Sequence, residues 1–414
     1  MRIFLVLATT IMALNGLTLS ESIDSALSNS PTVLISKSDI AYNKHLKDES
    51  IGGYHPTLQA KFSWQDIENP TAFSFSPSYN YGLHLKYNLF NGMSDYYNIE
   101  SKESDLNVAK YKKNAIMADL KLEVIMAYTN YLKAKKLIKS QTQQLESLTK
   151  QYDNTNVKYE QGIIAKNDLL LIDVERLNAQ QSLFKAKSDL KIAKSNLENI
   201  IVHKISESET IVDLDENLVK EPQELSYLED TMFKNRSEIK AILAKNKSLL
   251  SQRDALSGNY LPKVNLEASH QINDKQRSSG TTVFQSKDQT TYGVNVTWSI
   301  FSGFKNLAMK KAILEKSNQQ VFELHQLKLD LKKQLIQAYE NLKVAKSAKR
   351  VALRAKESAQ ENYRITADRY SYGDVDTLTL LVSQSNLTQA INKNNDAYYN
   401  LYLADKVLKR IIAE

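Results

Sequence analysis

Two long segments without glycine or proline constrain the fold of this chain more than any other feature. They span residues 93–159 and 304–371. In both segments apolar side chains recur at spacings of three and four residues, which is the periodicity of a coiled coil. An unbroken helix of this length extends about 100 Å, because an α-helix rises about 1.5 Å per residue. Ordinary amphipathic helices are shorter, so we expect two very long coiled-coil helices.

The two long segments belong to two copies of one repeat. Short motifs recur at a constant offset of 211 positions (292 − 81). The recurring motifs are Tyr81-Gly82 and Tyr292-Gly293, Phe90-x-Gly92 and Phe301-x-Gly303, Ala127-Tyr128 and Ala338-Tyr339, and Tyr159-x-x-Gly162 and Tyr370-x-x-Gly373. Self-similarity of this kind indicates a duplicated structural unit.

Upstream of these motifs the offset between the copies falls to 206 (260 − 54), because Tyr54-x-Pro56 matches Tyr260-x-Pro262. The second copy therefore carries five more residues (211 − 206), which a surface loop can hold. We expect a first repeat over residues 21–205, a linking segment over 206–225 and a second repeat over 226–414. The two aspartates of the linking segment, Asp213 and Asp215, are expected to be solvated.

Four segments alternate between apolar and polar residues, as strands with one apolar and one polar face do. They span residues 54–64, 79–89, 263–268 and 292–300. Three of the four runs are about 10 residues long, which suits a tilted transmembrane strand, and aromatic residues lie near the ends of the runs. A soluble sheet with one wet face is the alternative interpretation. Four strands cannot close a barrel, so a membrane barrel would be shared: two chains would supply eight strands and three would supply twelve.

Glycines mark the expected turns between helices. Gly162 and Gly373 interrupt the helical pattern, as residues that end a helix in the left-handed conformation do. We expect return helices over about 163–204 and 374–412, and shorter helices over about 22–51 and 226–257. A return helix and a shorter helix together nearly match one long helix in length. Stacked end to end, they would complete a hollow helical cylinder.

The N-terminus has the pattern of a secretory signal peptide. Arg2 supplies the positive charge and residues 3–14 form an apolar run that is too short to span a bilayer. We expect a signal peptide over residues 1–20, with cleavage after Gly16 or after Ser20. No later segment has the roughly 20 apolar residues of a membrane helix. The chain is therefore expected to be exported without a helical anchor.

The composition gives little support to enzymatic chemistry. The chain has no cysteine, which excludes disulfides, thiolate metal sites, cysteine nucleophiles and a lipid-modified cysteine. Its six histidines show no metal-binding spacing, and no phosphate-binding glycine loop is present. The net charge of +7 comes from 54 basic and 47 acidic residues that are closely mixed, as on solvated helix faces. We therefore expect no enzyme activity, no cofactor, no metal and no nucleic-acid partner.

These features together resemble the TolC-like outer-membrane efflux proteins over nearly the whole chain. The resemblance rests on Leu17-Thr18-Leu19 before Ala26-Leu27-x-Asn29-x-Pro31, and on the duplicated Tyr-x-Pro, Phe-x-Gly and Tyr-x-x-Gly motifs. It implies a mainly α chain with transmembrane β structure: a homotrimer with a shared 12-stranded β-barrel in outer-membrane lipid, four strands per chain, above a coiled-coil helical tunnel in the periplasm. It also implies two partners, a periplasmic adaptor (membrane fusion) protein and an inner-membrane transporter.

The resemblance also implies a gate at the periplasmic helix tips. Asp168 and Tyr370 fall where the family has an inter-helix hydrogen bond that holds the gate shut. The acidic ring of the best-known family member falls at Thr379 and Val382, and its arginine contact at Val375, so the chain departs from that pattern. The nearby carboxylates that could supply a displaced acidic ring are Asp374 and Asp376.

The function that the sequence favours is export of small molecules through a tripartite efflux system. Three alternatives stay open: the exit duct of a type I protein secretion system, a secreted structural coiled-coil protein, and a general diffusion porin. Strands of membrane length argue against the structural protein, because a fibre has no use for them. The long helices argue against the porin, and nothing in the sequence separates efflux from type I secretion.

Overall fold

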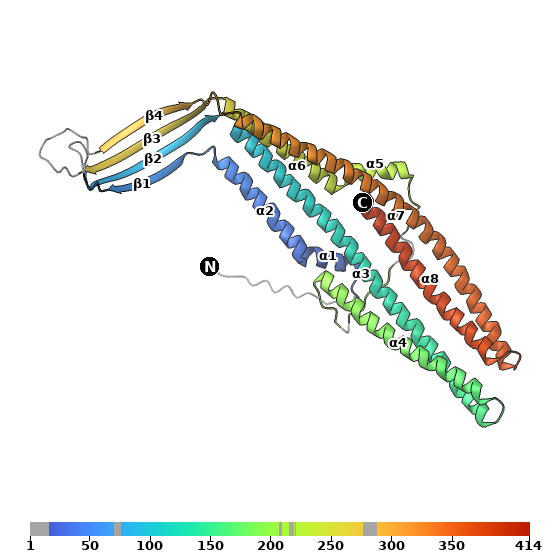
Figure 1. Ribbon diagram of the computed structural model, residues 1–414. Coiled ribbons are helices and arrows are strands. Elements are labelled where there is room, and N and C mark those ends of the chain that lie inside the picture. The colour runs from blue at the N-terminus through green and yellow to red at the C-terminus, as the bar shows by residue number, and fades with distance from the viewer. Residues whose placement is uncertain (1–15, 70–75, 207–208, 215–218, 220, 276–287) are drawn as a thin grey trace, which may run out of the picture. The chain divides into compact units, whose positions relative to one another are not determined.

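The computed structural model describes residues 16–69, 76–206, 209–214, 219, 221–275 and 288–414 (Figure 1). It divides into two compact units. The helical unit comprises Met1–Ile35, Lys113–Ser237 and Lys328–Glu414, and the sheet unit comprises Ser36–Lys112 and Glu238–Leu327. The expected signal peptide lies outside the described residues as far as residue 15.

The two predicted long helices are present, each 67 residues long. They are α3 (Ser94–Glu160) and α7 (Lys305–Ser371). Each is followed by a return helix of 36 residues, α4 (Lys166–Ile201) and α8 (Thr377–Ile412). The starts and ends of these helices recur at the predicted offset of 211 positions (305 − 94). The return helices begin three residues later than the sequence suggested, because residues 161–165 and 372–376 form the turns.

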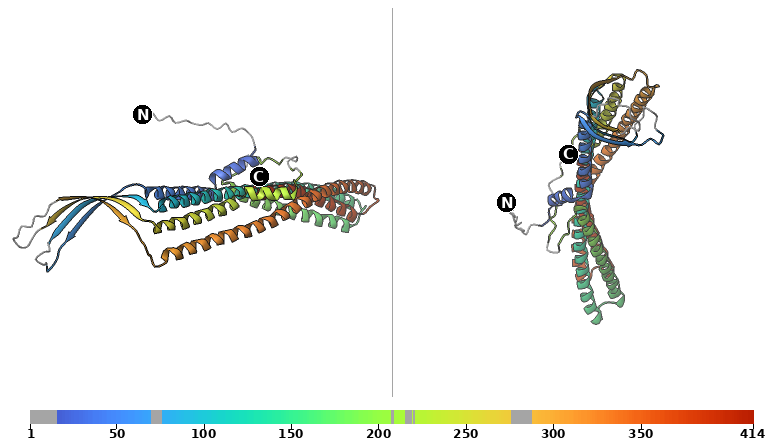
Figure 2. Two further views of the ribbon diagram at one scale, coloured as in Figure 1. Left: turned by 90° about the horizontal axis from the view of Figure 1, so that it is seen from above. Right: turned by 90° about the vertical axis from the view of Figure 1, so that its left-hand side faces the viewer.

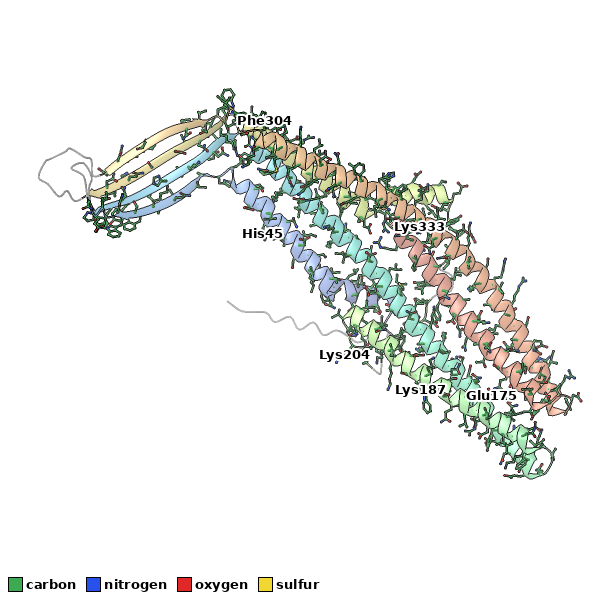
Figure 3. The ribbon with its side chains drawn as sticks, viewed as in Figure 1. His45, Glu175, Lys187, Lys204, Phe304 and Lys333 are labelled. Carbon is green, nitrogen blue, oxygen red and sulfur yellow. The ribbon has the colours of Figure 1, made fainter. Side chains whose placement is uncertain are left out.

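Residues with positive φ recur at the same offset of 211 positions. They form four pairs: Gly92 and Gly303, Met93 and Phe304, Gly162 and Gly373, Val202 and Ala413. Phe304 lies immediately before the first turn of α7 (Figure 3). A residue other than glycine in the left-handed region costs about 1–2 kcal/mol. Both copies bear this cost at the turn from strand to helix, at Met93 in the first and at Phe304 in the second.

The shorter helices predicted over 22–51 and 226–257 are each broken in two. The first consists of α1 (Leu19–Asn29) and α2 (Pro31–Gly52), and the second of α5 (Leu225–Asn235) and α6 (Ser237–Ala255). Ser30 is extended because the residue before a proline is disfavoured in the helical region. Arg236 breaks the second helix at the same place in the repeat, and its guanidinium donates to the carbonyl oxygens of Arg410 (2.9 Å) and Ile411 (3.4 Å).

The helical unit is held together by a buried apolar cluster. Tyr128 and Leu132 of α3, Leu197 and Ile201 of α4, and Ala26 of α1 are all nearly inaccessible to solvent. The N-terminus of α1 carries a capping box, in which Thr18 accepts from the amide of Glu21 and the Glu21 carboxylate accepts from Thr18. The charged side chains of Glu175 and Lys187 on α4 are exposed (Figure 3).

The sheet unit contains one antiparallel sheet in the order β1-β2-β3-β4, and the sheet is curved (Figure 2). Its strands are β1 (Thr57–Gln65), β2 (Ser78–Asn91), β3 (Lys263–Lys275) and β4 (Asp288–Thr297), and a 3₁₀ turn over Leu256–Tyr260 leads into β3. The strand predicted over 292–300 ends at 297. Two causes are visible: β4 pairs with β3 alone, and the indole of Trp298 donates to the carbonyl oxygen of Tyr260 (3.1 Å).

No helix in the described ranges is both long enough and apolar enough to cross a bilayer.

Candidate functional site: the two-faced sheet and the helix tips

Two neighbouring rows of residues across the sheet differ in polarity. The register places Leu85 of β2 opposite Leu58 of β1 and Ala268 of β3, and Ala268 in turn opposite Tyr292 of β4. The neighbouring row is polar, and it consists of Gln59, His84, Ser269 and Thr291. Leu58 and Tyr292 are 67 % and 79 % exposed in the single chain. An apolar face of this kind belongs against lipid or protein and a polar face against water.

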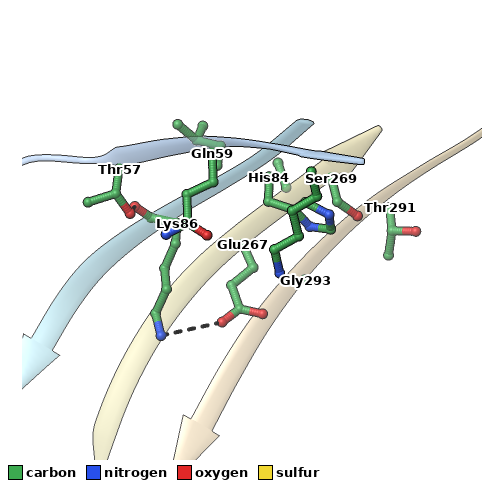
Figure 4. Close-up of a pocket in the computed structure, with 11 residues that line it drawn as sticks. Thr57, Gln59, His84, Lys86, Glu267, Ser269, Thr291 and Gly293 are labelled. Carbon is green, nitrogen blue, oxygen red and sulfur yellow. Dashed lines mark hydrogen bonds and ion pairs between the residues drawn. The ribbon is translucent and has the colours of Figure 1, made fainter. Parts of the chain in front are cut away.

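The polar face is hollowed into a depression of about 280 Å³ (Figure 4). Lys61, His84, Lys86 and Glu267 contribute its ionisable side chains. The ammonium of Lys86 lies 3.9 Å from the carboxylate of Glu267 on the neighbouring strand, and both are about half exposed. An exposed pair of this kind contributes at most about 1 kcal/mol to stability.

Two helix tips close the other ends of α3 and α7. At the first tip Gly162 has φ +73° and donates to Tyr159 O, while Ile163 donates to Lys158 O. At the second, Gly373 has φ +82° and donates to Tyr370 O, while Asp374 donates to Arg369 O. These are the paired bonds of a Schellman motif, so both glycines end their helices as predicted.

The two return helices start differently. Asp376 is the N-cap of α8, and its carboxylate accepts from the amide of Thr379 (2.8 Å). Hydrogen bonds from Thr379 hold the pKa of Asp376 below its ordinary value. The equivalent residue of α4 is Ala165, which provides no side-chain cap. The pattern Asp-x-x-Thr just before an apolar helix could have revealed the α8 cap from sequence.

Tyr370 makes its contacts within the tips, but not with Asp168. Its hydroxyl lies 3.4 Å from the hydroxyl of Thr377, and the ammonium of Lys158 lies 5.4 Å from its ring centre. Asp168 lies in the first turn of α4, partly exposed. Among the described contacts of the single chain there is none between Asp168 and Tyr370. The contact with Thr377, seven residues away across a turn, could not be read from the sequence.

The other residues at the family's gate positions are mostly exposed. Asp374 is exposed, and so are Thr379 and Val382, while Val375 is partly exposed. Asp376 is exposed but already accepts a hydrogen bond as a helix cap. The carboxylates of the second tip therefore face solvent in a single chain, where a neighbouring molecule could meet them.

Hydrogen bonds and one ion pair hold the linking segment against the helices. We call the residues that form them the strap: Leu17, Tyr128, Lys136, Val212, Asp213 and Tyr399. The Tyr128 hydroxyl lies 3.0 Å from Leu17 O and 2.5 Å from Val212 O. Asp213 accepts from the Tyr399 hydroxyl (2.8 Å) and pairs with the Lys136 ammonium (2.6 Å). Asp213 is exposed to solvent, as expected, but two helices also supply donors to it, which the sequence did not indicate. Asp215 lies outside the described residues.

The strap should weaken in acid. Burial raises the pKa of Asp213, but hydrogen bonds from Lys136 and Tyr399 outweigh it, so the net shift is downward. A carboxylate with a lowered pKa stabilises the fold fully above its ordinary value near 3.8 and loses that contribution as the pH falls below it. We expect Asp213→Asn to lower the free energy of unfolding at pH 7 by about 1 kcal/mol, a modest figure because the pair is partly exposed.

Denaturant unfolding at pH 7 and at pH 3 measures this effect. The difference between wild type and Asp213→Asn should shrink at the lower pH. Asp189→Asn, which removes an exposed carboxylate from α4, is the matched control and should change little at either pH. An equal loss in both variants would contradict a specific role for the strap.

The described residues contain no group of three or more histidine, aspartate or glutamate side chains that could hold a metal ion.

Comparison with known proteins shows which family and which solved structures this architecture resembles. The family model described as outer membrane efflux protein matches residues 48–202 and 230–414. No curated protein sequence matches the chain. Among solved structures, the chain is similar to CusC, whose structures concern folding and transmembrane channel formation (14 % identity, TM-score 0.82, 95 % of this chain and 91 % of CusC covered).

Two further channels have the same fold. One is the CmeC outer membrane channel of Campylobacter jejuni, at 15 % identity and a TM-score of 0.81 over 95 % of this chain and 85 % of CmeC. The other is the MtrE outer membrane channel of Neisseria gonorrhoeae in its open state, at 16 % identity and 0.80 over 95 % of this chain and 88 % of MtrE. The family match covers most of the chain on both sides of the repeat, so the chain belongs to the outer membrane efflux protein family and is an outer-membrane protein.

Proposed function

We propose that the chain is the channel subunit of a tripartite efflux system that exports small molecules across the periplasm and outer membrane. In this proposal three copies share one barrel of twelve strands and one helical tunnel. A periplasmic adaptor protein and an inner-membrane transporter complete the pathway, and this subunit performs no chemistry.

The observation that carries the proposal is a sheet with one apolar face and two open edges. Within the part of the chain that the structure describes, the edge strands β1 and β4 each have a strand partner on one side only (Figure 1). Unpaired backbone N–H and C=O groups are not tolerated in lipid, and the smallest membrane barrels have about eight strands. Several copies must therefore contribute to one barrel. Three copies, the number that the family resemblance implies, give twelve strands.

The long helices support a tunnel. Each of α3 and α7 has 67 residues and thus extends about 100 Å, a length that no membrane-embedded domain requires. The polar tips at their far ends are the place where such a tunnel would close. We assign the gate to Asp168, Tyr370, Asp374 and Asp376, with Gly162 and Gly373 fixing the two turns.

Single-channel conductance in planar bilayers tests both the channel and its gate. We expect a low conductance for wild type and a several-fold higher one for the double variant Asp168→Ala with Tyr370→Phe, because the variant removes a polar group from each tip. Tyr159→Phe is the matched control: it changes the equivalent tyrosine of the other tip and should conduct like wild type.

The possible outcomes separate the two claims. A pore whose conductance is unchanged by the double variant would contradict the role of Asp168 and Tyr370 but keep the channel. Absence of any conductance, in protein that is folded and inserted, would contradict the channel itself.

A further inference from the structure

Residues 17–20, the last four of the expected signal peptide, are built into the fold of the helical unit. Leu17 is only 8 % exposed and belongs to the buried apolar cluster. It forms a parallel β-bridge with Ile211, and its carbonyl oxygen accepts from the amide of Val212 (3.1 Å) and the hydroxyl of Tyr128 (3.0 Å). A mature chain that began after these four residues would lose the whole contact.

Thr18 completes the start of α1. Its hydroxyl accepts from the amide of Glu21 (3.2 Å), and its carbonyl oxygen accepts from the amide (3.0 Å) and the hydroxyl (2.9 Å) of Ser22. Ser22 is fully buried, so loss of Thr18 would leave two buried donors without their acceptor, which is costly. A chain that began at Glu21 would also place its ammonium at the N-terminus of α1, where the helix dipole disfavours positive charge.

The sequence around the cut allows two positions. Signal peptidases prefer small residues immediately before the cut and two positions earlier. Ser20 fits this rule together with Thr18, but a cut after Ser20 would remove the contacts just described. Gly16 is the only small residue between Leu14, where the apolar run ends, and Leu17. The fold therefore favours the position that the sequence rule ranks second.

We propose that a signal peptidase cuts the chain between Gly16 and Leu17, so that Leu17 is the first residue of the mature protein. One water molecule hydrolyses the amide bond between them. The released peptide then ends in the carboxylate of Gly16, and the mature chain begins with the ammonium of Leu17. The proposal rests on export of the chain to the outer membrane and not on the channel function proposed above.

The same contacts require the cut to precede folding. In the folded chain Gly16 lies so close to Thr210 that a methyl group added to it would overlap the carbonyl group of Thr210. Leu17 on the other side of the bond is buried. Proteases act on opened chain segments, so the bond is cut while it is still free of its partners. The sequence allows this order, because Ile211 follows Leu17 by 194 positions (211 − 17).

The first residue of the protein purified from outer membranes tests the proposal directly. N-terminal sequencing should read Leu-Thr-Leu-Ser-Glu, which is the sequence from Leu17. Gly16→Leu replaces the small residue before the cut and should raise the amount of unprocessed precursor several-fold. Ser20→Leu is the matched control: Ser20 is exposed on α1, so this variant should be processed like wild type. A native chain that begins at Glu21, or at any residue other than Leu17, would overturn the proposal.

Two fusions with defined starts test why the cut lies there. A foreign signal peptide ending in Ala-x-Ala is joined directly to Leu17 in one fusion and to Glu21 in the other, and the intact mass verifies each start. The chain that begins at Leu17 should give as much heat-modifiable oligomer as wild type. The chain that begins at Glu21 should give at least several-fold less, because it lacks the β-bridge and the helix cap.

The outcomes of the fusions keep this proposal apart from the channel. Equal amounts of oligomer from both fusions would show that residues 17–20 are dispensable, and would overturn the structural basis of the proposed cut. A native start at Leu17 in a protein without conductance would overturn the channel and support the cut site.

Discussion

Leu85→Arg is expected to abolish the membrane-inserted form of the protein, while His84→Arg leaves it intact. The two residues are neighbours in β2 and point to opposite faces of the sheet, because successive side chains of a strand alternate. Leu85 lies in the wholly apolar row with Leu58, Ala268 and Tyr292. An arginine on the lipid face near the middle of a membrane strand costs about 2–4 kcal/mol, and a barrel of three copies would bear that cost three times.

His84 provides a control with the same added side chain in the same strand. It lies among polar side chains and lines the depression on the polar face (Figure 4). An arginine there stays hydrated, and its repulsion from Lys86 is weak because that side chain is about half exposed. The amount of His84→Arg protein inserted in the membrane should therefore match that of wild type.

Heat-modifiable oligomers in the outer-membrane fraction measure the effect. Wild type and His84→Arg should give similar amounts, and Leu85→Arg should give almost none. If the two arginine variants behave alike, the apolar face is not the lipid-facing one. If His84→Arg alone fails, the faces of the sheet are assigned the wrong way round.

Periodicity predicted the long helices and strands well because it reports directly on which face is buried. The 67-residue helices and the recurrence at 211 positions were visible in the sequence for this reason. The ends of the helices and strands were predicted less well, because each end depends on a few single contacts. The break at Ser30 follows from Pro31, which is adjacent, but Arg236 donates to carbonyl groups 174 and 175 positions away.

The candidate site was less predictable than the fold. The helix-ending glycines could be located, because a left-handed residue at a helix end is a local property. The contact of Tyr370 with Thr377 depends on how one turn closes, and the strap on Asp213 depends on α3 and α8 meeting the linking segment. The early end of β4 has a different cause: alternation continues to Ile300, but a strand persists only where a neighbour supplies hydrogen bonds.

Gly92→Ala is expected to prevent the chain from folding stably. Gly92 has φ +61°, where an alanine costs about 1–2 kcal/mol. The added methyl group would also overlap backbone atoms of Gly258, which a flexible side chain could not relieve. Overpacking of that kind typically adds about 1–3 kcal/mol. The combined cost is a large fraction of the stability of an ordinary domain.

Gly373→Ala separates backbone strain from the close contact. Gly373 has a similar conformation, φ +82°, with no atom within 4 Å of its Cβ position, so alanine there should cost the strain alone. The denaturant midpoint and the yield of folded chain should therefore fall much further for Gly92→Ala than for Gly373→Ala. Equal losses would mean that φ alone makes these glycines necessary, and that the approach of Gly92 to Gly258 carries no energetic weight.

Gly303→Ala extends the argument to the assembly. Gly303 has φ +61°, as Gly92 does, but in the single chain its Cβ position is open. If a neighbouring copy packs there as Gly258 packs on Gly92, the variant chain should fold about as well as Gly373→Ala and yet fail to form oligomers. A variant that folds and assembles normally would show that this position stays open in the channel. The same substitution at two equivalent glycines thus distinguishes a contact that folds the chain from one that joins it to the next.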